Sequence, residues 1–295
     1  MYDSECSNAN YANMAWHSLS YSLIDYPVLA TAYSKKQAVD SAKFFVAPDR
    51  VKAMQEKIII LNGALNTQSI DEAVKRTKGK RFEKTTLYFG GRFTATKGGD
   101  FATECYDLAY KTGKDVEIKV TTPSKSGKVA SVKEKAKEVE FFTDLSQEEA
   151  WDVMVQSHIS IFPQTLRMLP SAVFEQIYAG LIVIVNRKNN AGLLPPEYPF
   201  FYDTEDEARA MLRFAIMNYD DAVKKVQGFG QWVKENNSLD ASIKTLFDKI
   251  YEDYEADMSH FRSKPFVTHL CTKILKEAKK EVQTNGLSFR RLCGR

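Results

Sequence analysis

Segments typical of β-strands alternate with segments typical of α-helices along most of this chain. The strand-like segments are short runs rich in β-branched and aromatic residues, and the segments between them carry apolar residues at helical spacing. We expect eight strands, at 28–33, 57–61, 85–89, 115–120, 139–142, 158–162, 181–185 and 200–202. We expect helices near 35–45, 99–111, 146–156, 171–179 and 204–217, and a mostly helical end over 220–283. This alternation is typical of a parallel sheet with helices on both faces, so the predicted fold class is α/β.

The composition is that of a soluble globular protein. The 295 residues are 44% apolar and 27% charged, enough for one large domain or two modest ones. No apolar run approaches the roughly 20 residues of a membrane span, and the first residues do not resemble a secretory signal, so we expect a cytoplasmic protein without a transmembrane segment. The four cysteines are far apart and never in C-x-x-C spacing, which predicts free thiols rather than a zinc site or disulfides.

Charge is distributed unevenly along the chain. Residues 264–295 contain eight Lys and Arg against two Glu, a net charge of +6, which leaves −3 for residues 1–263. Such a basic end can bind a nucleic acid or an anionic membrane surface. The plainer interpretation is a solvated helix face followed by a frayed terminus.

The stretch from Thr85 to Asp100 predicts an anion site. A strand-like run ends in Gly90 and Gly91, two cations follow at Arg92 and Lys97, and a helical pattern starts near Gly99. Glycines let the chain turn sharply and approach a ligand, and a helix N-terminus attracts phosphate. The alternative is an ordinary strand-turn-helix with a solvated arginine and lysine.

Two polar segments predict boundaries, and one helix start is clearly marked. Residues 66–84 are polar and basic without a strong apolar period, as in a linker, and the lysine-rich segment 123–137 predicts an exposed loop or short helix. Ser146 and Glu149 have the spacing of a capping box, which predicts a helix beginning there.

Four blocks of sequence resemble, in order, the donor-binding half of GT-B glycosyltransferases of the retaining group 1/4-type family. They are the strand and turn at 58–66, the Gly-Arg and Lys-Gly block at 87–98, the strand ending in proline at 157–163, and the helix-to-strand block at 174–184. The resemblance implies a Rossmann-like parallel sheet of GT-B type. It also implies a nucleotide-sugar donor, such as a UDP- or GDP-sugar, as substrate, with no cofactor and no bound metal.

The resemblance also implies roles for individual residues. Arg92 and Lys97 match the catalytic cations that hold the donor diphosphate, and Gly91 belongs to the same block. Developing negative charge on that diphosphate is what such cations stabilise in the transition state. Backbone N–H groups at the start of the helix that holds Ser171 and Ala172 would add to this stabilisation, as helix N-termini do for phosphates generally.

Two positions of the E-x7-E motif of the family fall on Arg167 and Glu175. Glu175 matches the second glutamate, which accepts hydrogen bonds from the ribose hydroxyls, although without the resemblance it would be a surface carboxylate of a helix. Arg167 replaces the first glutamate, near the transferred sugar. A cation there implies a different or acidic sugar, a relocated carboxylate, or lost activity.

Compared with the family, the first domain is short. We expect an incomplete acceptor-side unit at 1–66, a linker at 67–83, the donor-binding domain at 84–260 and a basic helical tail at 261–295. A partner chain or a homodimer would then complete the cleft. The predicted activity is sugar transfer with retention to an unknown acceptor. The alternatives are a phage-type enzyme that glycosylates a hydroxymethylated DNA base, with nucleic acid held by the basic tail, and a non-catalytic relative that binds a nucleotide sugar.

Overall fold

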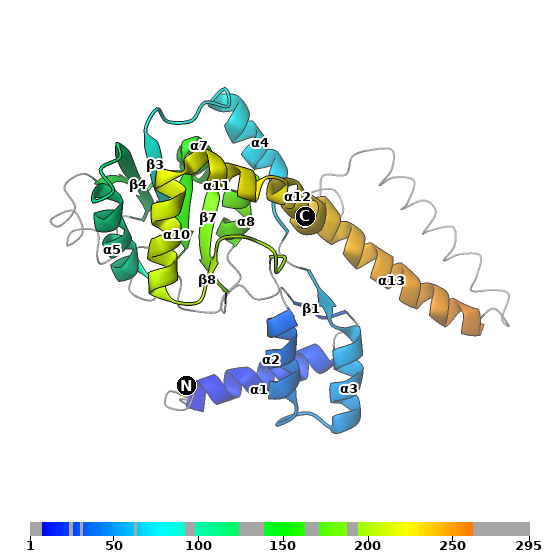
Figure 1. Ribbon diagram of the computed structural model, residues 1–295. Helices are drawn as coiled ribbons and strands as arrows, with labels where there is room; N and C mark the ends of the chain where they lie inside the picture. The colour runs from blue at the N-terminus through cyan, green and yellow to red at the C-terminus, as the bar shows by residue number, and fades with distance from the viewer. Residues whose placement is uncertain are drawn as a thin grey trace. The chain divides into compact units, whose positions relative to one another are not determined.

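The computed structural model describes residues 8–23, 26–29, 32–61, 64–91, 98–123, 139–162, 171–187 and 194–261. By its contacts the chain divides into two units, one through Thr245 and a second from Leu246. Figure 1 shows the chain coloured from its N-terminus to its C-terminus.

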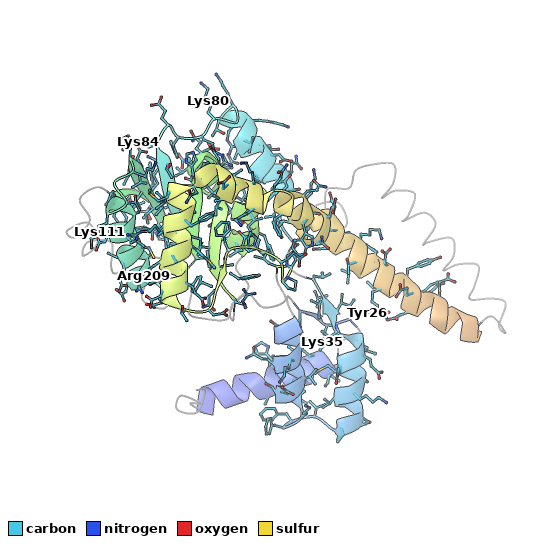
Figure 2. All side chains as sticks on the ribbon, viewed as in Figure 1. Tyr26, Lys35, Lys80, Lys84, Lys111 and Arg209 are labelled. Atoms are coloured by element: carbon cyan, nitrogen blue, oxygen red, sulfur yellow. The ribbon has the colours of Figure 1, made fainter. Side chains whose placement is uncertain are left out.

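The first elements form a small α/β group with its own core. Helices α1 (Asn8–Leu23), α2 (Ala32–Ala42) and α3 (Pro48–Lys57) accompany two short strands, β1 (Val28–Leu29) and β2 (Ile59–Ile60), which pair in parallel. The core consists of Val39, Ala42, Val51, Met54 and Ile58. The two strands confirm the predicted ones at shorter length, whereas α1 and α3 were not among the predicted helices. Lys35, labelled in Figure 2, donates a hydrogen bond from α2 to the carbonyl of Ile58, at 3.2 Å.

A six-stranded parallel sheet forms the centre of residues 64–245. Its strands are β3 (Thr85–Gly90), β4 (Val116–Thr122), β5 (Val139–Thr143), β6 (Ile159–Phe162), β7 (Ile182–Asn186) and β8 (Phe201–Tyr202). They lie in the order β5-β4-β3-β6-β7-β8, and every neighbouring pair is parallel. All six strands confirm predicted ones to within two residues at either end.

Helices cover both faces of this sheet, as a parallel sheet requires. On one face α5 (Gly99–Tyr110) packs against α10 (Glu205–Met217). On the other, α7 (Gln147–Gln156) and α8 (Ser171–Tyr178) pack against α4 (Thr67–Arg76), and α8 also packs against α12 (Phe229–Asn237). The strand β7 is buried from Ile182 to Val185, which explains why its sequence is a continuous apolar run rather than an alternating one.

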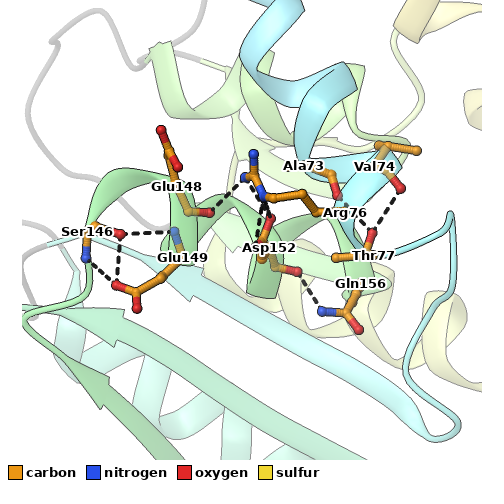
Figure 3. Close-up of polar contacts among 9 residues, drawn as sticks. All are labelled: Ala73, Val74, Arg76, Thr77, Ser146, Glu148, Glu149, Asp152 and Gln156. Carbon is orange, nitrogen blue, oxygen red and sulfur yellow. Dashed lines mark hydrogen bonds and ion pairs between the residues drawn. The ribbon is translucent and has the colours of Figure 1, made fainter.

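The segment 67–83, predicted to be a linker, instead forms a helix over its first half. Helix α4 is capped by the Asn66 side chain, which accepts a hydrogen bond from the backbone of Ser69. Only Ile70 and Ala73 of this helix are buried in the core, and the polar and basic composition of the segment resembles that of a linker. Arg76 and Asp152 form an ion pair between α4 and α7, at 2.8 Å (Figure 3).

The predicted helical end is confirmed as far as the structure describes it. It consists of α11 (Tyr219–Val226), α12 and α13 (Leu239–Phe261). Leu65, just before α4, forms an isolated parallel bridge with Ser238 at the junction of α12 and α13. The basic tail beyond residue 261 lies outside the described residues. Among the helices of the described part, none combines the length and the hydropathy needed to cross a membrane.

Candidate functional site

The strand order reverses between β3 and β6, and the region outside the carboxyl ends of these two strands is called the crevice below. Numbered along the chain within this sheet, the order is 3-2-1-4-5-6, so connections from β3 run toward one edge and connections from β6 toward the other. The two strands are direct neighbours, with Leu87 opposite Ile159 and Tyr88 opposite Ser160. In open α/β sheets ligands bind outside the carboxyl ends of the strands at this point of reversal. The candidate site is therefore the edge where β3 ends at Gly90 and β6 ends at Phe162.

Gly91 has the backbone geometry of a sharp turn at this edge. Its N–H donates a hydrogen bond to the carbonyl of Thr121 on β4, at 2.9 Å, and its φ is 126°, which side chains of L-residues rarely allow. A Cβ atom at this position would meet no atom of the described residues within 4 Å. Glycine is therefore required by the backbone conformation rather than by crowding from the described residues.

The predicted cations follow directly after this turn but lie outside the described residues. This applies to Arg92 and Lys97, which stand between Gly91 and the start of α5, and to Arg167, which stands between β6 and α8. Their convergence on a diphosphate therefore stays a prediction. The structure fixes the two ends between which Arg92 and Lys97 lie, Gly91 and the left-handed Gly98 that precedes α5.

The three predicted site residues on α8 occupy its first two turns. Ser171 is exposed and Ala172 half-buried at the start of the helix, on the side of the sheet where β6 ends. Glu175 follows one turn later and is half-buried, not the exposed carboxylate of a surface helix. Gly91 directly follows β3, and α8 is the next described element after β6, the strand that neighbours β3.

Burial raises the pKa of the Glu175 carboxyl, and the nearby indole of Trp151 on α7 opposes this effect. Burial raises the pKa of the Tyr88 phenol to about 12, and the negative charge of Glu175 adds to this increase. The phenol is therefore neutral at neutral pH.

Several polar residues beside the crevice were not among the predicted ones. The Tyr88 hydroxyl and the Thr121 hydroxyl are hydrogen bonded at 2.8 Å, and a Cβ on Gly90 would lie 2.5 Å from the same phenol oxygen. Ser160, opposite Tyr88 on β6, has a buried hydroxyl with no hydrogen-bond partner among the described residues. The signal in the sequence was a polar residue within an apolar strand, which becomes informative only when the strand order is known.

The fold can be compared with that of known proteins. Neither the models of protein families nor the curated protein sequences include a match to this chain. Solved structures do match. The chain is similar to sucrose-phosphate synthase from Thermosynechococcus elongatus, with a TM-score of 0.64 at 11% identity, over 86% of this chain and 65% of that one.

Two further solved structures show the same likeness. A glycosyltransferase from Rickettsia africae matches with a TM-score of 0.58 at 14% identity, over 81% of this chain and 66% of that one. The pneumococcal O-GlcNAc transferase GtfA, solved with UDP and GlcNAc, matches with a TM-score of 0.58 at 10% identity, over 80% of this chain and 47% of that one.

This chain thus spans about half to two thirds of the length of these structures. At such low identities the likeness concerns the fold, which agrees with the parallel sheet and the strand order described above. The predicted fold class is confirmed: the chain contains a Rossmann-like parallel sheet of GT-B type, as these structures do.

Proposed function

We propose that this chain binds a nucleotide-sugar donor at the crevice between β3 and β6 and transfers the sugar with retention of configuration. The observation that supports the proposal is the reversal of strand order between β3, which Gly91 follows, and β6, after which α8 is the next described element. The likeness to glycosyltransferases, one of them solved with UDP, agrees with it. The acceptor is not assigned.

The proposed chemistry depends on charge at the leaving group. When the bond between the sugar and the diphosphate breaks, negative charge grows on the diphosphate. Arg92 and Lys97 neutralise this charge, and because it is larger in the transition state than in the bound donor, they lower the barrier. The carboxylate of Glu175 accepts hydrogen bonds from the ribose hydroxyls, and the backbone N–H groups at Ser171 and Ala172 face the phosphates. Arg167 lies near the transferred sugar.

The first experiment measures binding without knowledge of the acceptor. Isothermal titration of UDP, GDP and ADP, each free and as a sugar conjugate, identifies the donor base. Substituting Arg92→Ala or Lys97→Ala should weaken binding by about 10- to 100-fold, the value of one charge-assisted hydrogen bond. Lys111→Ala is the matched control, because Lys111 stands at the opposite end of α5 from Lys97 and should leave affinity unchanged.

A second experiment separates an enzyme from a binding protein. Slow hydrolysis of the donor, followed by proton NMR of the released sugar, should be lost in both cation variants, and the anomer first released should have the configuration of the donor. Binding without turnover on any acceptor would instead support the non-catalytic alternative. No binding of any of the three nucleotides would refute the proposal.

A further inference from the structure

We infer that Tyr88 is a positioning residue of the proposed donor site: its buried phenol fixes the turn at 90–91, which leads directly into Arg92. This inference rests on the proposed function. It adds to the site a residue that does not touch the donor but holds the backbone directly before a proposed catalytic cation.

The side chain of Tyr88 reaches along its own strand toward the carboxyl edge of the sheet. Its hydroxyl is hydrogen bonded, at 2.8 Å, to the hydroxyl of Thr121 on β4. The residue of β3 opposite Thr121 is not Tyr88 but Gly90, two positions further along. A Cβ added to Gly90 would lie 2.5 Å from the phenol oxygen and 2.9 Å from two ring carbons of Tyr88. The ring therefore occupies the place where a side chain at position 90 would stand.

Thr121 connects this phenol with the backbone of the turn. Its side chain bonds to Tyr88, and its carbonyl accepts a hydrogen bond from the N–H of Gly91, at 2.9 Å. Gly91 is the first residue after β3, so this bond holds the start of the turn against β4. Because both bonds meet at one residue, a shift of the Tyr88 phenol displaces Thr121 and, through it, Gly91.

The two glycines of the turn are required for different reasons. Gly91 has a φ of 126°, a conformation that L side chains rarely adopt. Gly90 has no such φ, and it is the Tyr88 ring that leaves no room for a Cβ there. The turn is therefore shaped by its own backbone at one position and by contact with Tyr88 at the other.

The two hydroxyls are buried, which makes them useful for an experiment. Tyr88 and Thr121 are both buried residues, and each hydroxyl has the other as its partner. If one hydroxyl is removed, the other stays buried without that partner, which costs stability. If both are removed, an apolar contact of similar shape remains and the cost is small. The effect on stability and the effect on the turn can therefore be measured separately.

Tyr88→Phe, Thr121→Val and the double variant test the inference. The probes are whichever of UDP, GDP and ADP binds best and its nucleoside, which lacks the diphosphate. Affinity for the diphosphate should fall about 3- to 10-fold in all three variants, the value of one hydrogen bond, while affinity for the nucleoside stays within about twofold of wild type. The melting temperature should fall in the single variants and recover in the double variant. A double variant that regains affinity together with stability would overturn the inference.

The route through Arg92 has its own test. In the Arg92→Ala background, Tyr88→Phe should change affinity for the diphosphate by less than about twofold, because the turn then no longer carries that cation. Independent losses from the two substitutions would overturn the inference and leave the proposed function intact.

Tyr198→Phe is the matched control. The Tyr198 hydroxyl is also buried and donates to the carbonyl of Val183, at 2.8 Å, on β7, two strands away from β3. This variant should lower the melting temperature as Tyr88→Phe does, and it should bind the diphosphate like wild type. Thermal melting also shows whether each variant is folded at the temperature of the titration.

Amide hydrogen exchange, followed by NMR, provides a readout that needs no ligand. In Tyr88→Phe, exchange of the Gly91 N–H should accelerate more than exchange of the Leu87 N–H in the same strand, because the substitution loosens the turn rather than the sheet. Equal acceleration at the two positions would overturn the inference while leaving the proposed function intact. If none of the three nucleoside diphosphates binds the wild-type chain, the proposed function fails, and the inference fails with it.

Discussion

The imidazole of His158 accepts a hydrogen bond from the backbone N–H of Thr86 at its Nδ1 atom, at 3.1 Å. His158 precedes β6 and Thr86 lies in β3, so this contact joins the two central strands of the sheet at the end opposite the candidate site. Only a neutral imidazole can accept here. Burial, with a smaller contribution from the charge of Arg81, lowers the pKa of His158 from 6.5 to about 4.

Folding stability should therefore depend on pH through His158. Above pH 6.5 the histidine is neutral in both the folded and the unfolded chain, and its full contribution to the free energy of unfolding is present. As the pH falls from 6.5 to about 4, the unfolded chain binds a proton that the folded chain excludes, so up to about 3 kcal/mol is lost. Urea unfolding of wild type and His158→Asn at several pH values measures this. The difference between them should change across that interval and level off below it; a difference that stays constant from pH 7 to 4 would contradict the prediction.

Arg81 should be a major contributor to stability, although it forms no ion pair in the described structure. Its guanidinium donates to the carbonyls of Val155, Ser157 and Ala179, at the ends of α7 and α8. Arg81→Ala leaves these carbonyls without their donor and should cost about 2 to 4 kcal/mol in urea unfolding. Arg76→Ala is the control, because Arg76 forms an exposed ion pair with Asp152, and such pairs contribute little. Equal losses in the two variants would refute the assignment.

These examples show which parts of the structure local sequence can predict. The strands were predicted correctly because a short apolar run such as 182–185 fits few structures other than a buried strand. The start of α7 was predicted correctly because Ser146 and Glu149, which bond to each other, lie within one turn. The role of Arg81 was not visible, because its acceptors lie 74 to 98 residues away along the chain. Helix α4 was missed because a segment so rich in polar and basic residues resembles a linker, although its apolar Ile70, Ala73 and Val74 do have helical spacing.

The candidate site also has features that the local sequence predicts and features that depend on distant parts of the chain. Gly91 was recognised from its place in a strand-turn-helix pattern, and its left-handed φ agrees with that reason. The place of Ser160 opposite Tyr88 was not visible, because it depends on the order of the strands. Strand order is set by long-range packing, which a pattern within one segment does not contain.

The capping box of α7 should be worth a measurable part of the stability. Ser146 accepts from the backbone of Glu149, and the Glu149 carboxylate accepts from the backbone of Ser146 at 2.8 Å (Figure 3). Ser146→Ala should lower stability by about 1 kcal/mol, and Ser146→Asp, which restores an acceptor, should return most of it. Urea unfolding checks both variants; a loss of the same size for Ala and Asp would show that the cap does not matter.

Gly180→Ala should lower the free energy of unfolding more than Gly113→Ala, although both glycines have a left-handed backbone conformation. Its φ is 82°, and a Cβ there would lie 2.9 Å from the Arg81 guanidinium, whereas Gly113 has a φ of 71° and open space within 4 Å. Gly113→Ala should therefore cost only the left-handed strain, about 1 to 2 kcal/mol. Gly180→Ala should cost more, because it also displaces Arg81 from the Ala179 carbonyl. In the Arg81→Ala background this excess should disappear, since the steric conflict is gone. A double-mutant cycle by urea unfolding measures the coupling, and additive costs would show that the arginine adjusts freely.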